Sequence, residues 1–287
     1  MSLTLKKIIE GVPSLGSYSG VLHEIEAVLE DPSSTLAHVG AIIEKDPDLT
    51  ARLLRLGNSS FFGFPSRIDT VSETISLIGL QQVQDLIAVS SVIELFDGVP
   101  PELVTMESFW KHSLACGMAA RLLALAKRIP KADKFFVAGL LHDIGRMVLY
   151  TRAPTEAKEI FKGCASGTVL MRDAEVAVLG FDHAEIGEAL LAAWNYPANL
   201  VDMVRHHHCP LSAGTYQMES SLIHVADYLV HAMELGVSGE RMVPPLNPKA
   251  WERLALGMDV IESVMTGVDA QLVDVERAFL ARVAVKA

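Results

Sequence analysis

The dipeptide His142-Asp143, within Leu141-His142-Asp143-Ile144-Gly145, is the part of this 287-residue chain best suited to chemistry. Most of the ten histidines lie on either side of it, between positions 112 and 231. Imidazole nitrogens and carboxylate oxygens together suit Zn, Mn, Fe or Ni better than Ca or Mg, which take mainly oxygen ligands. We therefore expect one metal centre, which draws on His142, Asp143 and side chains from elsewhere in the chain: His112, His183, the run His206-His207-His208, and Asp227.

The three cysteines, Cys116, Cys164 and Cys209, do not favour a thiolate site. They form no C-x-x-C pair, and an odd, irregularly spaced set argues against a disulfide framework. Residues 1–12 are not followed by an apolar signal core, and no run of about 18 apolar residues predicts a transmembrane helix. A reducing cytoplasm is the expected location.

Charge limits the kinds of partner. Lys and Arg number 24 against 35 Asp and Glu, which gives a net charge of −11. Broad binding to DNA or RNA depends on clustered basic side chains that displace phosphate counterions, so nucleic acid is not an expected partner. A small phosphorylated ligand stays compatible with this charge, because a metal site supplies local positive charge.

Helices must position the candidate ligands. Apolar residues recur at spacings of three and four almost throughout, and alternation with period two is nearly absent, which predicts an all-α protein. Gly98, Pro100 and Pro101 mark a boundary between an N-terminal helical lobe, residues 1–98, and a second lobe with C-terminal helices, residues 99–287. The predicted helices cover 21–30, 35–45, 47–57, 71–78, 81–95, 106–128, 133–141, 143–152, 155–164, 168–179, 183–194, 198–208, 216–234 and 258–284.

Two helix starts in the first lobe carry clear signals. Asp46 before Pro47 provides an N-cap and a proline at the first helical position. Thr70 and Glu73 have the spacing of a capping box. The aromatic residues between these helices, in the loop 57–69, are expected to anchor the loop in the core, with an exposed docking surface as the alternative.

The predicted helix 258–284 carries an apolar stripe that includes Val264, Leu272 and Phe279. We expect this stripe to pack on the core. A homodimer interface is the alternative.

His142 and Asp143 cannot complete a metal's ligand shell by themselves. Adjacent residues on a helix project about 100° apart, so the two can flank a metal only from one helix end. The other candidate ligands lie on separate predicted helices, as they do in bundle-core metal sites. The prediction therefore requires these helices to converge.

The order His112, His142-Asp143, Asp227 resembles the H…HD…D pattern of the HD metal-dependent phosphohydrolase superfamily. The segments 43–47, 53–59 and 78–80 are similar to the N-terminal helical part of the HDOD family, a regulatory module of bacterial signalling proteins. His183-Ala184-Glu185-Ile186-Gly187, residues 194–197 and His207-His208 also fit that family, so the resemblance covers nearly the whole chain. It implies an N-terminal helical lobe packed on an HD-type metal-binding lobe.

The ligand pattern is also similar to that of the HD-GYP cyclic-dinucleotide phosphodiesterases. This resemblance implies one or two bound metals, with Fe favoured over Mn, Ni or Zn and with Asp143 as the bridge. Two such metals lower the pKa of bound water and stabilise charge on a phosphodiester. The implied ligands are His112, His142, Asp143, His183, His207, His208 and Asp227.

Three departures from the HD-GYP pattern weaken the expectation of catalysis. Arg146 stands where those relatives carry a lysine, so the compact ammonium becomes a planar guanidinium. Cys209-Pro210-Leu211-Ser212 follows the histidine pair in place of the glycine-tyrosine-proline signature. Ser108, one turn before His112, cannot replace the glutamate that supports a third metal in some relatives.

The resemblance therefore implies a cytoplasmic bacterial HDOD protein of signalling or regulation, which binds partner signalling proteins and senses a small phosphorylated ligand. The alternative is an active metal-dependent phosphohydrolase that cleaves a nucleotide or cyclic-nucleotide phosphodiester, with Asp143 and Arg146 as its catalytic residues. A structural interaction module with an empty site is a third possibility. Arg146 and Arg205 either bind an anion or pair with carboxylates, and the pattern assigns no metal to the remaining histidines: His23, His38, His206, His224 and His231.

Overall fold

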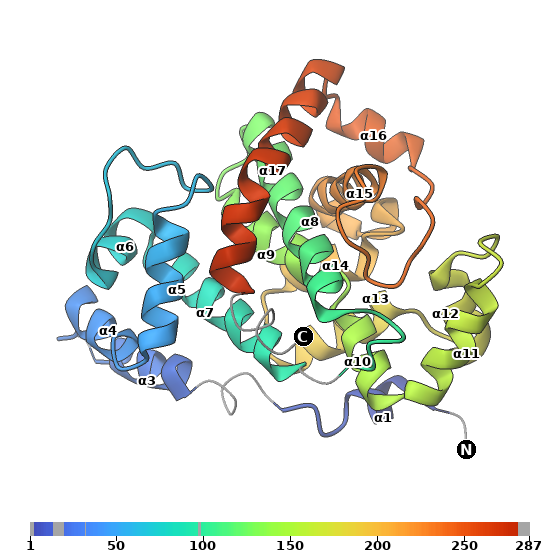
Figure 1. Ribbon diagram of the computed structural model, residues 1–287, viewed down its shortest axis with the longest axis horizontal. Coiled ribbons are helices and arrows are strands. Elements are labelled where there is room, and N and C mark those ends of the chain that lie inside the picture. Colours follow the sequence, from blue (N-terminus) through green and yellow to red (C-terminus); the bar gives the residue numbers. More distant parts are fainter. Residues whose placement is uncertain (1–2, 14–19, 32, 97–98, 281–287) are drawn as a thin grey trace. The chain divides into compact units, whose positions relative to one another are not determined.

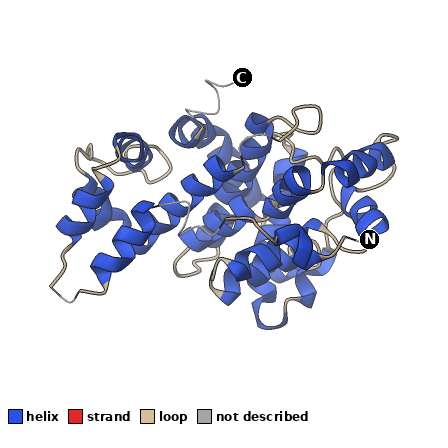
Figure 2. Ribbon diagram, turned by 90° about the horizontal axis from the view of Figure 1, so that it is seen from below, coloured by secondary structure: helices blue, strands red, loops and turns tan. Residues whose placement is uncertain are grey.

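The computed structural model describes residues 3–13, 20–31, 33–96 and 99–280, and their regular structure is helical, with no strand among them (Figure 2). The all-α prediction is therefore confirmed. The chain forms two compact units. The larger unit comprises Met1–Val12 and Phe96–Asp269, the smaller unit comprises Pro13–Leu95 and Ala270–Ala287, and the division falls within the last helix.

The smaller unit contains α3 (Gly20–Leu29), α4 (Leu36–Ile43), α5 (Pro47–Gly57), α6 (Val71–Ile78) and α7 (Leu80–Leu95). The larger unit contains α1 (Leu5–Ile9), α8 (Met106–Ala126), α9 (Asp133–Leu141), α10 (Ile144–Arg152), α11 (Pro154–Cys164), α12 (Met171–Leu179), α13 (His183–Ala193), α14 (Ala198–His206), two 3₁₀ turns (Pro210–Ser212 and Gly214–Tyr216), α15 (Gln217–Ala232) and α16 (Pro248–Leu254). The last helix, α17, runs over Met258–Phe279.

Every predicted helix has a counterpart within a few residues of its expected ends, and residues 281–284 of the last prediction lie outside the described residues. The patterns missed α1 and α16. The second of these carries a local signal, because the Asn247 side chain accepts hydrogen bonds from two amides at the start of α16 and Pro248 is the first helical residue. Its seven residues are too few to show a helical period.

The helix starts predicted in the first lobe are present. The Asp46 side chain accepts hydrogen bonds from the amides of Asp48 and Leu49, both at 3.0 Å. Thr70 accepts one from the Glu73 amide at 3.1 Å, whereas the Glu73 carboxylate accepts from the Asp69 amide at 3.3 Å, one residue before the amide that a closed capping box would use. In the loop between α5 and α6, Phe61 is buried and its ring lies 4.9 Å from that of Phe62, which supports an anchoring role for this loop.

Helix α8 forms the centre of the larger unit's core. Phe109, Trp110, Leu114 and Met118 are fully buried, although they lie on different sides of the helix. A helix that is apolar all round must be covered on all sides. It packs against α9 and α15 (Figure 1), which are the helices that lead to His142 and carry Asp227.

Glycines let α8 and α9 approach closely. A Cβ atom added at Gly139 would lie 2.7 Å from the Gly117 Cα and 2.8 Å from the Cys116 carbonyl oxygen, both of which are backbone atoms. This crossing sets the distance between His112, on α8, and His142, at the end of α9. A side chain at position 139 would force the two helices apart.

A glycine also allows α10 and α13 to approach closely. A Cβ atom at Gly145 would overlap the His183 carbonyl oxygen and would lie 2.8 Å from the Gly187 amide nitrogen. Gly145 therefore allows Asp143, at the start of α10, and His183, at the start of α13, to lie side by side.

A capping box fixes the start of α13. The Asp182 carboxylate accepts from the Glu185 amide at 3.0 Å, and the Glu185 carboxylate accepts from the Asp182 amide at 3.0 Å. Arg172 donates to the other Asp182 oxygen at 2.8 Å. These contacts orient the first turn of α13, from which the His183 side chain extends.

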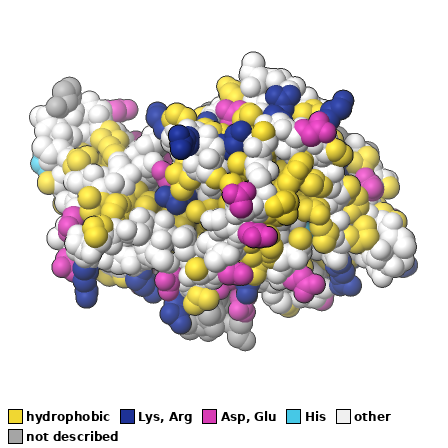
Figure 3. All heavy atoms as spheres, turned by 90° about the horizontal axis from the view of Figure 1, so that it is seen from above, with side chains coloured by type: hydrophobic (Ala, Val, Ile, Leu, Met, Phe, Trp, Pro, Cys, Tyr) yellow, Lys and Arg dark blue, Asp and Glu magenta, His cyan; other side chains and the backbone are white. Residues whose placement is uncertain are grey.

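The described surface shows no gathering of one kind of charge on the face in Figure 3, where acidic, basic and apolar side chains are interspersed. No single helix among the described residues has both the length and the apolar composition needed to cross a bilayer. The pair α6 and α7 passes that test only when taken together, and it bends by 113° between the two helices.

We predict that Gly139→Ala lowers the stability of the protein by about 1–3 kcal/mol, because the added methyl group overpacks the α8–α9 crossing. Thermal and urea unfolding followed by circular dichroism would measure it. Gly163→Ala, on α11, is the matched control, since its new Cβ would meet only the Ala174 Cβ at 3.9 Å. Equal stabilities for the two variants would contradict the proposed close approach.

We also predict that Asp182→Ala destabilises the protein most at neutral pH. Burial alone would raise the pKa of Asp182, but the neighbouring His183 charge, Arg172 and the Glu185 amide lower that pKa from 3.8 to about 2. A lowered folded-state pKa contributes stability above pH 3.8, here about 2 kcal/mol, and this stability is lost as pH falls toward 2. Urea unfolding of wild type and variant between pH 7 and pH 2 should show the difference shrink in that window, and a constant difference would contradict it.

Candidate metal centre

The seven predicted ligands lie close together in the larger unit, although they come from different helices. His112 lies within α8, His142 directly follows α9, and Asp143 directly precedes α10. His183 begins α13 and Asp227 lies within α15. His207 ends α14 and His208 follows it. All are buried except His208, which is partly exposed.

One group of donors surrounds the Asp227 carboxylate. Its Oδ1 atom lies 3.2 Å from His112 Nε2 and 3.5 Å from His142 Nε2. We call this group, His112, His142 and Asp227 together with Asp143, the first metal position. It supplies two imidazoles and two carboxylates.

A second group consists of three imidazoles. His183 Nε2 lies 3.3 Å from His207 Nε2 and 2.9 Å from His208 Nε2. Nitrogen lone pairs that face one another at such distances need a proton or a metal ion between them. We call this group, His183, His207 and His208 together with Asp143, the second metal position.

Asp143 lies between the two positions. Its Oδ2 atom is 3.4 Å from His142 Nε2, and its Oδ1 atom is 3.0 Å from His183 Nε2 and 3.8 Å from His207 Nε2. One carboxylate oxygen thus faces each group. This is the arrangement expected of a bridging ligand.

The donor atoms have unused hydrogen-bonding capacity that fits a bound cation. His112 Nε2, His142 Nε2, Asp143 Oδ1 and Asp227 Oδ1 are all buried and make no well-directed hydrogen bond among the residues that the structure describes, although imidazoles and carboxylates of the set lie within ion-pair distance of one another. Leaving such atoms unpaired is unfavourable by about 1–3 kcal/mol each, more for charged groups. All four belong to the convergent set, so a metal ion would satisfy them together.

The outer ring nitrogens orient two of the imidazoles. His142 Nδ1 donates to the Gly139 carbonyl at 2.6 Å, and His207 Nδ1 donates to the Val204 carbonyl at 2.7 Å. Each ring then directs its Nε2 atom to the centre, as is usual for metal-binding histidines.

Burial keeps part of the set in the form that binds metals. It lowers the pKa of His112 to about 4 and the pKa of His207 to about 3, so both rings are neutral near pH 7. For His183, burial and Arg146 act in the same direction, but Glu175 and Asp143 outweigh them and raise its pKa to about 9. A metal at the second position would therefore displace a proton from His183.

Arg146 is buried beside the centre. Its Nη1 atom donates to Asp143 Oδ2 at 3.0 Å and to the Ser238 hydroxyl at 2.6 Å. Arg205 pairs with carboxylates, at 3.0 Å from Glu188 and 3.3 Å from Glu185. The anion-binding alternative for these arginines stays a prediction.

Two residues that carried no motif support lie at the first metal position. His231 Nδ1 is 2.9 Å from Asp227 Oδ1, and the Cys116 sulfur lies near His142 and Asp227, with their ligand atoms within 4.8 Å of one another. Each follows a predicted ligand by four residues on the same helix, Cys116 after His112 and His231 after Asp227. That spacing places side chains on one helix face and is a signal that could have found them.

The other motif histidines have supporting contacts. His206 Nε2 lies 3.5 Å from the Asp202 carboxylate on the same helix. His224 donates from Nδ1 to the His207 carbonyl at 2.8 Å and accepts at Nε2 from the Asn247 amide at 2.9 Å. It thereby ties the segment of the histidine run to the start of α16.

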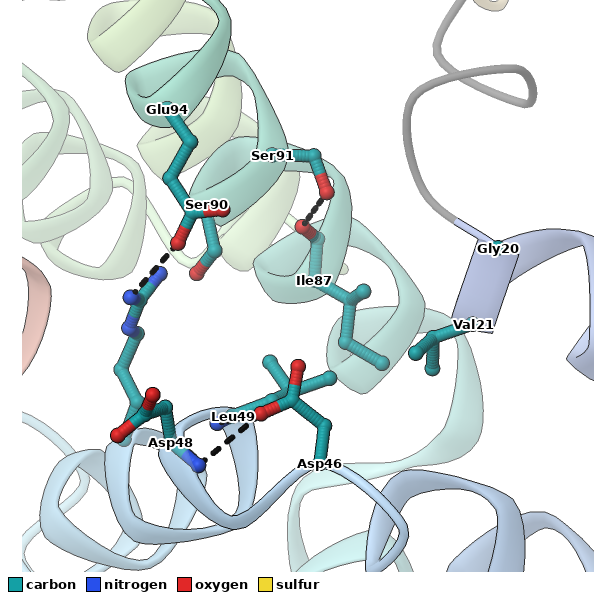
Figure 4. A pocket seen from close by; sticks show the side chains of 10 residues that line it. Gly20, Val21, Asp46, Asp48, Leu49, Ile87, Ser90, Ser91 and Glu94 are labelled. Atoms are coloured by element: carbon teal, nitrogen blue, oxygen red, sulfur yellow. Dashed lines mark hydrogen bonds and ion pairs between the residues drawn. The ribbon is translucent and has the colours of Figure 1, made fainter.

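The smaller unit holds a pocket of about 140 Å³ between α3, α5 and α7, which none of the predicted ligands lines (Figure 4). Arg52 donates to Glu94 at 3.1 Å within it, and Ser91 donates to the Ile87 carbonyl at 3.0 Å. We assign no chemistry to this pocket.

The sequence of this chain matches a known family model and one curated relative. The family model of the HDOD domain matches residues 15–210. An uncharacterized protein of Treponema pallidum (strain Nichols) is 27% identical over 231 residues, which cover 79% of this chain and 43% of that protein. The chain thus spans less than half the length of this relative.

Several solved structures share the fold. An HDOD domain protein of unknown function from Geobacter sulfurreducens has a TM-score of 0.76 at 23% identity, covering 96% of this chain and 97% of that one. A proposed phosphohydrolase from Shewanella amazonensis has a TM-score of 0.73 at 22% identity, with the same coverage. A proposed signal transduction protein from Marinobacter aquaeolei has a TM-score of 0.68 at 20% identity and covers 99% of this chain and 61% of that one. Because the HDOD model matches well over half of its length, this chain belongs to the HDOD family.

Proposed function

We propose that this HDOD chain is a signalling or regulatory module whose two-metal centre binds a small phosphorylated ligand. The observation that carries the proposal is the convergence of six other buried or nearly buried donors around Asp143 from different helices. The role in the cytoplasm of a bacterium, with other signalling proteins as partners, belongs to the same proposal.

The donor set decides which metals suit the site. Imidazole and carboxylate ligands favour transition metals. The resemblance to HD-GYP sites makes Fe the first choice, with Mn, Ni or Zn as alternatives. Such ions, when bound, would supply positive charge for phosphate oxygens and lower the pKa of bound water. The chain itself would hold the first metal with His112, His142, Asp143 and Asp227, and the second with Asp143, His183, His207 and His208.

The surroundings of the centre favour binding over turnover. The Arg146 guanidinium is itself buried and contacts Asp143 and Ser238. The solved structure from Marinobacter aquaeolei, described as a proposed signal transduction protein, is consistent with this role.

A metal-dependent phosphohydrolase that cleaves a nucleotide or cyclic-nucleotide phosphodiester is the second candidate. It is favoured by the position of Asp143 between the two donor groups, since paired metals are typical of phosphodiester hydrolysis. Two of the similar structures, both from Shewanella amazonensis, are described as proposed phosphohydrolases. In this candidate Arg146 would steady charge at the site from beside Asp143.

Metal content tests the shared basis of both candidates. We predict that the protein, after removal of metals and reconstitution, binds two ions per chain, and that Asp143→Asn binds at most one, because the bridge loses its charge. Elemental analysis after gel filtration would measure this, with His206→Ala as the matched histidine control. Less than about a tenth of an equivalent in the wild type would favour a structural module with an empty site.

Turnover separates the two candidates. For the regulatory role we predict that the metal-loaded protein binds a cyclic dinucleotide or mononucleotide without hydrolysing it. Calorimetry would measure binding, and chromatography would follow the nucleotide, with bis-p-nitrophenyl phosphate as a general phosphodiester. Metal-dependent turnover above an Asp143→Ala control would overturn the regulatory role in favour of the hydrolase.

A further inference from the structure

Arg146 and Glu175 form a buried ion pair outside the predicted ligand set. Arg146 is 2% exposed and Glu175 is fully buried, and Arg146 Nε lies 3.5 Å from Glu175 Oε1. Burying two charges is unfavourable unless each is well paired and hydrogen-bonded. The remaining contacts of the two side chains show what this pair does for its surroundings.

The Arg146 end of the pair holds the bridging carboxylate. Arg146 Nη1 donates to Asp143 Oδ2 at 3.0 Å, and the Ser238 hydroxyl donates to the same oxygen. Arg146 also donates to that hydroxyl at 2.6 Å, so the three groups form a closed triangle. Two donors thus orient Asp143 and leave its Oδ1 atom directed toward His183, at 3.0 Å from His183 Nε2.

The Glu175 end holds a ligand of the second metal position. Glu175 Oε2 lies 2.5 Å from His183 Nδ1 and accepts from the His183 amide at 2.9 Å. A carboxylate on the outer nitrogen of a histidine fixes the ring orientation and makes the inner nitrogen a stronger ligand. Glu175, on α12, therefore sets the direction of His183 Nε2.

The segment that supplies Ser238 is itself held in place. The Tyr150 hydroxyl, one turn after Arg146 on α10, donates to the Ser238 carbonyl at 2.8 Å. The buried Glu240 carboxylate accepts from the Met171 amide, at the start of α12, at 2.7 Å. The same elements that carry Arg146 and Glu175 thus also fix Ser238.

We infer that Arg146 and Glu175 are positioning residues that couple the bridging Asp143 to His183, so that the two metal positions fill together. The inference rests on the proposed metal centre and deepens it. A guanidinium suits this task because its Nη1 and Nε atoms reach Asp143 and Glu175 in different directions, whereas an ammonium is a single point of charge. The arginine that departs from the HD-GYP pattern thus acquires a role in this chain.

The test is a titration of the metal-free protein with Mn²⁺, followed by electron paramagnetic resonance. In the wild type we expect two ions to bind together and to give the signal of a spin-coupled pair. In Glu175→Gln we expect affinity at the second position to fall about 10- to 100-fold, as for other outer carboxylates, so that isolated Mn²⁺ accumulates first. In Arg146→Lys we expect both positions to weaken.

Two further variants guard against misfolding and nonspecific effects. Arg121→Lys changes a partly buried arginine that pairs with Asp133 at 2.6 Å, and we expect wild-type Mn²⁺ binding from it. Ser238→Ala keeps the ion pair and removes one donor to Asp143, and we expect it to weaken pairwise binding. The Ser238→Ala variant tests the coupling by itself if circular dichroism shows that Arg146→Lys or Glu175→Gln is unfolded.

The outcomes distinguish the inference from the proposed function. A wild type that binds no Mn²⁺ in this titration and no metal in the reconstitution followed by elemental analysis overturns both. A wild type that binds a coupled pair, together with folded variants of Arg146, Glu175 and Ser238 that bind the same pair with the same affinity, overturns the coupling and leaves the metal centre intact.

Discussion

The Asp143 carboxylate is buried among imidazoles from α8, α9, α13 and α14. The arrangement of the larger unit depends on stabilising this buried charge. A carboxylate that is 2% exposed is stable as an anion only where positive charge or hydrogen-bond donors surround it. Burial alone would raise its pKa, but Arg146, His142 and His183 lower that pKa well below its ordinary value. The carboxylate is therefore charged, and the surrounding helices must bring these partners to it.

The backbone meets this demand by close helix crossings. Gly139 lets α9 approach α8, and Gly145 lets α10 approach α13, because a Cβ atom at either position would meet backbone atoms of the partner helix. His112, His142, Asp143 and His183 lie at or beside these crossings. The packing of the core and the geometry of the candidate metal centre are thus the same problem, since neither crossing can move without displacing a ligand.

The buried charges outside the ligand set give one departure from the HD-GYP pattern, the arginine at position 146, a physical meaning. The guanidinium of Arg146 contacts Asp143 and Ser238 and lies beside Glu175. These contacts depend on the fixed, planar arrangement of its nitrogen atoms. Arg146 thus orients the metal-binding side chains and is not free to bind the phosphate of a small molecule. That arrangement agrees with a module that holds metals and responds to binding.

Much of the fold was predictable from the sequence because helices depend on local spacing. The three- and four-residue apolar period, the Asp46 and Thr70 caps and the proline at position 47 all act within a few residues of one another. The short helix α16 was missed because seven residues do not display a period, although Asn247 and Pro248 carry the start signal. Helix ends differed by a few residues, as after Ala126, where the prediction continued over Lys127 and Arg128.

The candidate site was likewise predictable from the sequence only in part. The sequence by itself determined which residues to expect at the centre. The signals were the dipeptide His142-Asp143, the histidine run and the family resemblance, all of which depend only on the order of residues in the chain. Only the tertiary structure decided that Asp143 faces both donor groups and that Glu175 orients His183. These contacts join residues that are far apart in the chain or carry no motif, and helix packing alone brings their side chains together.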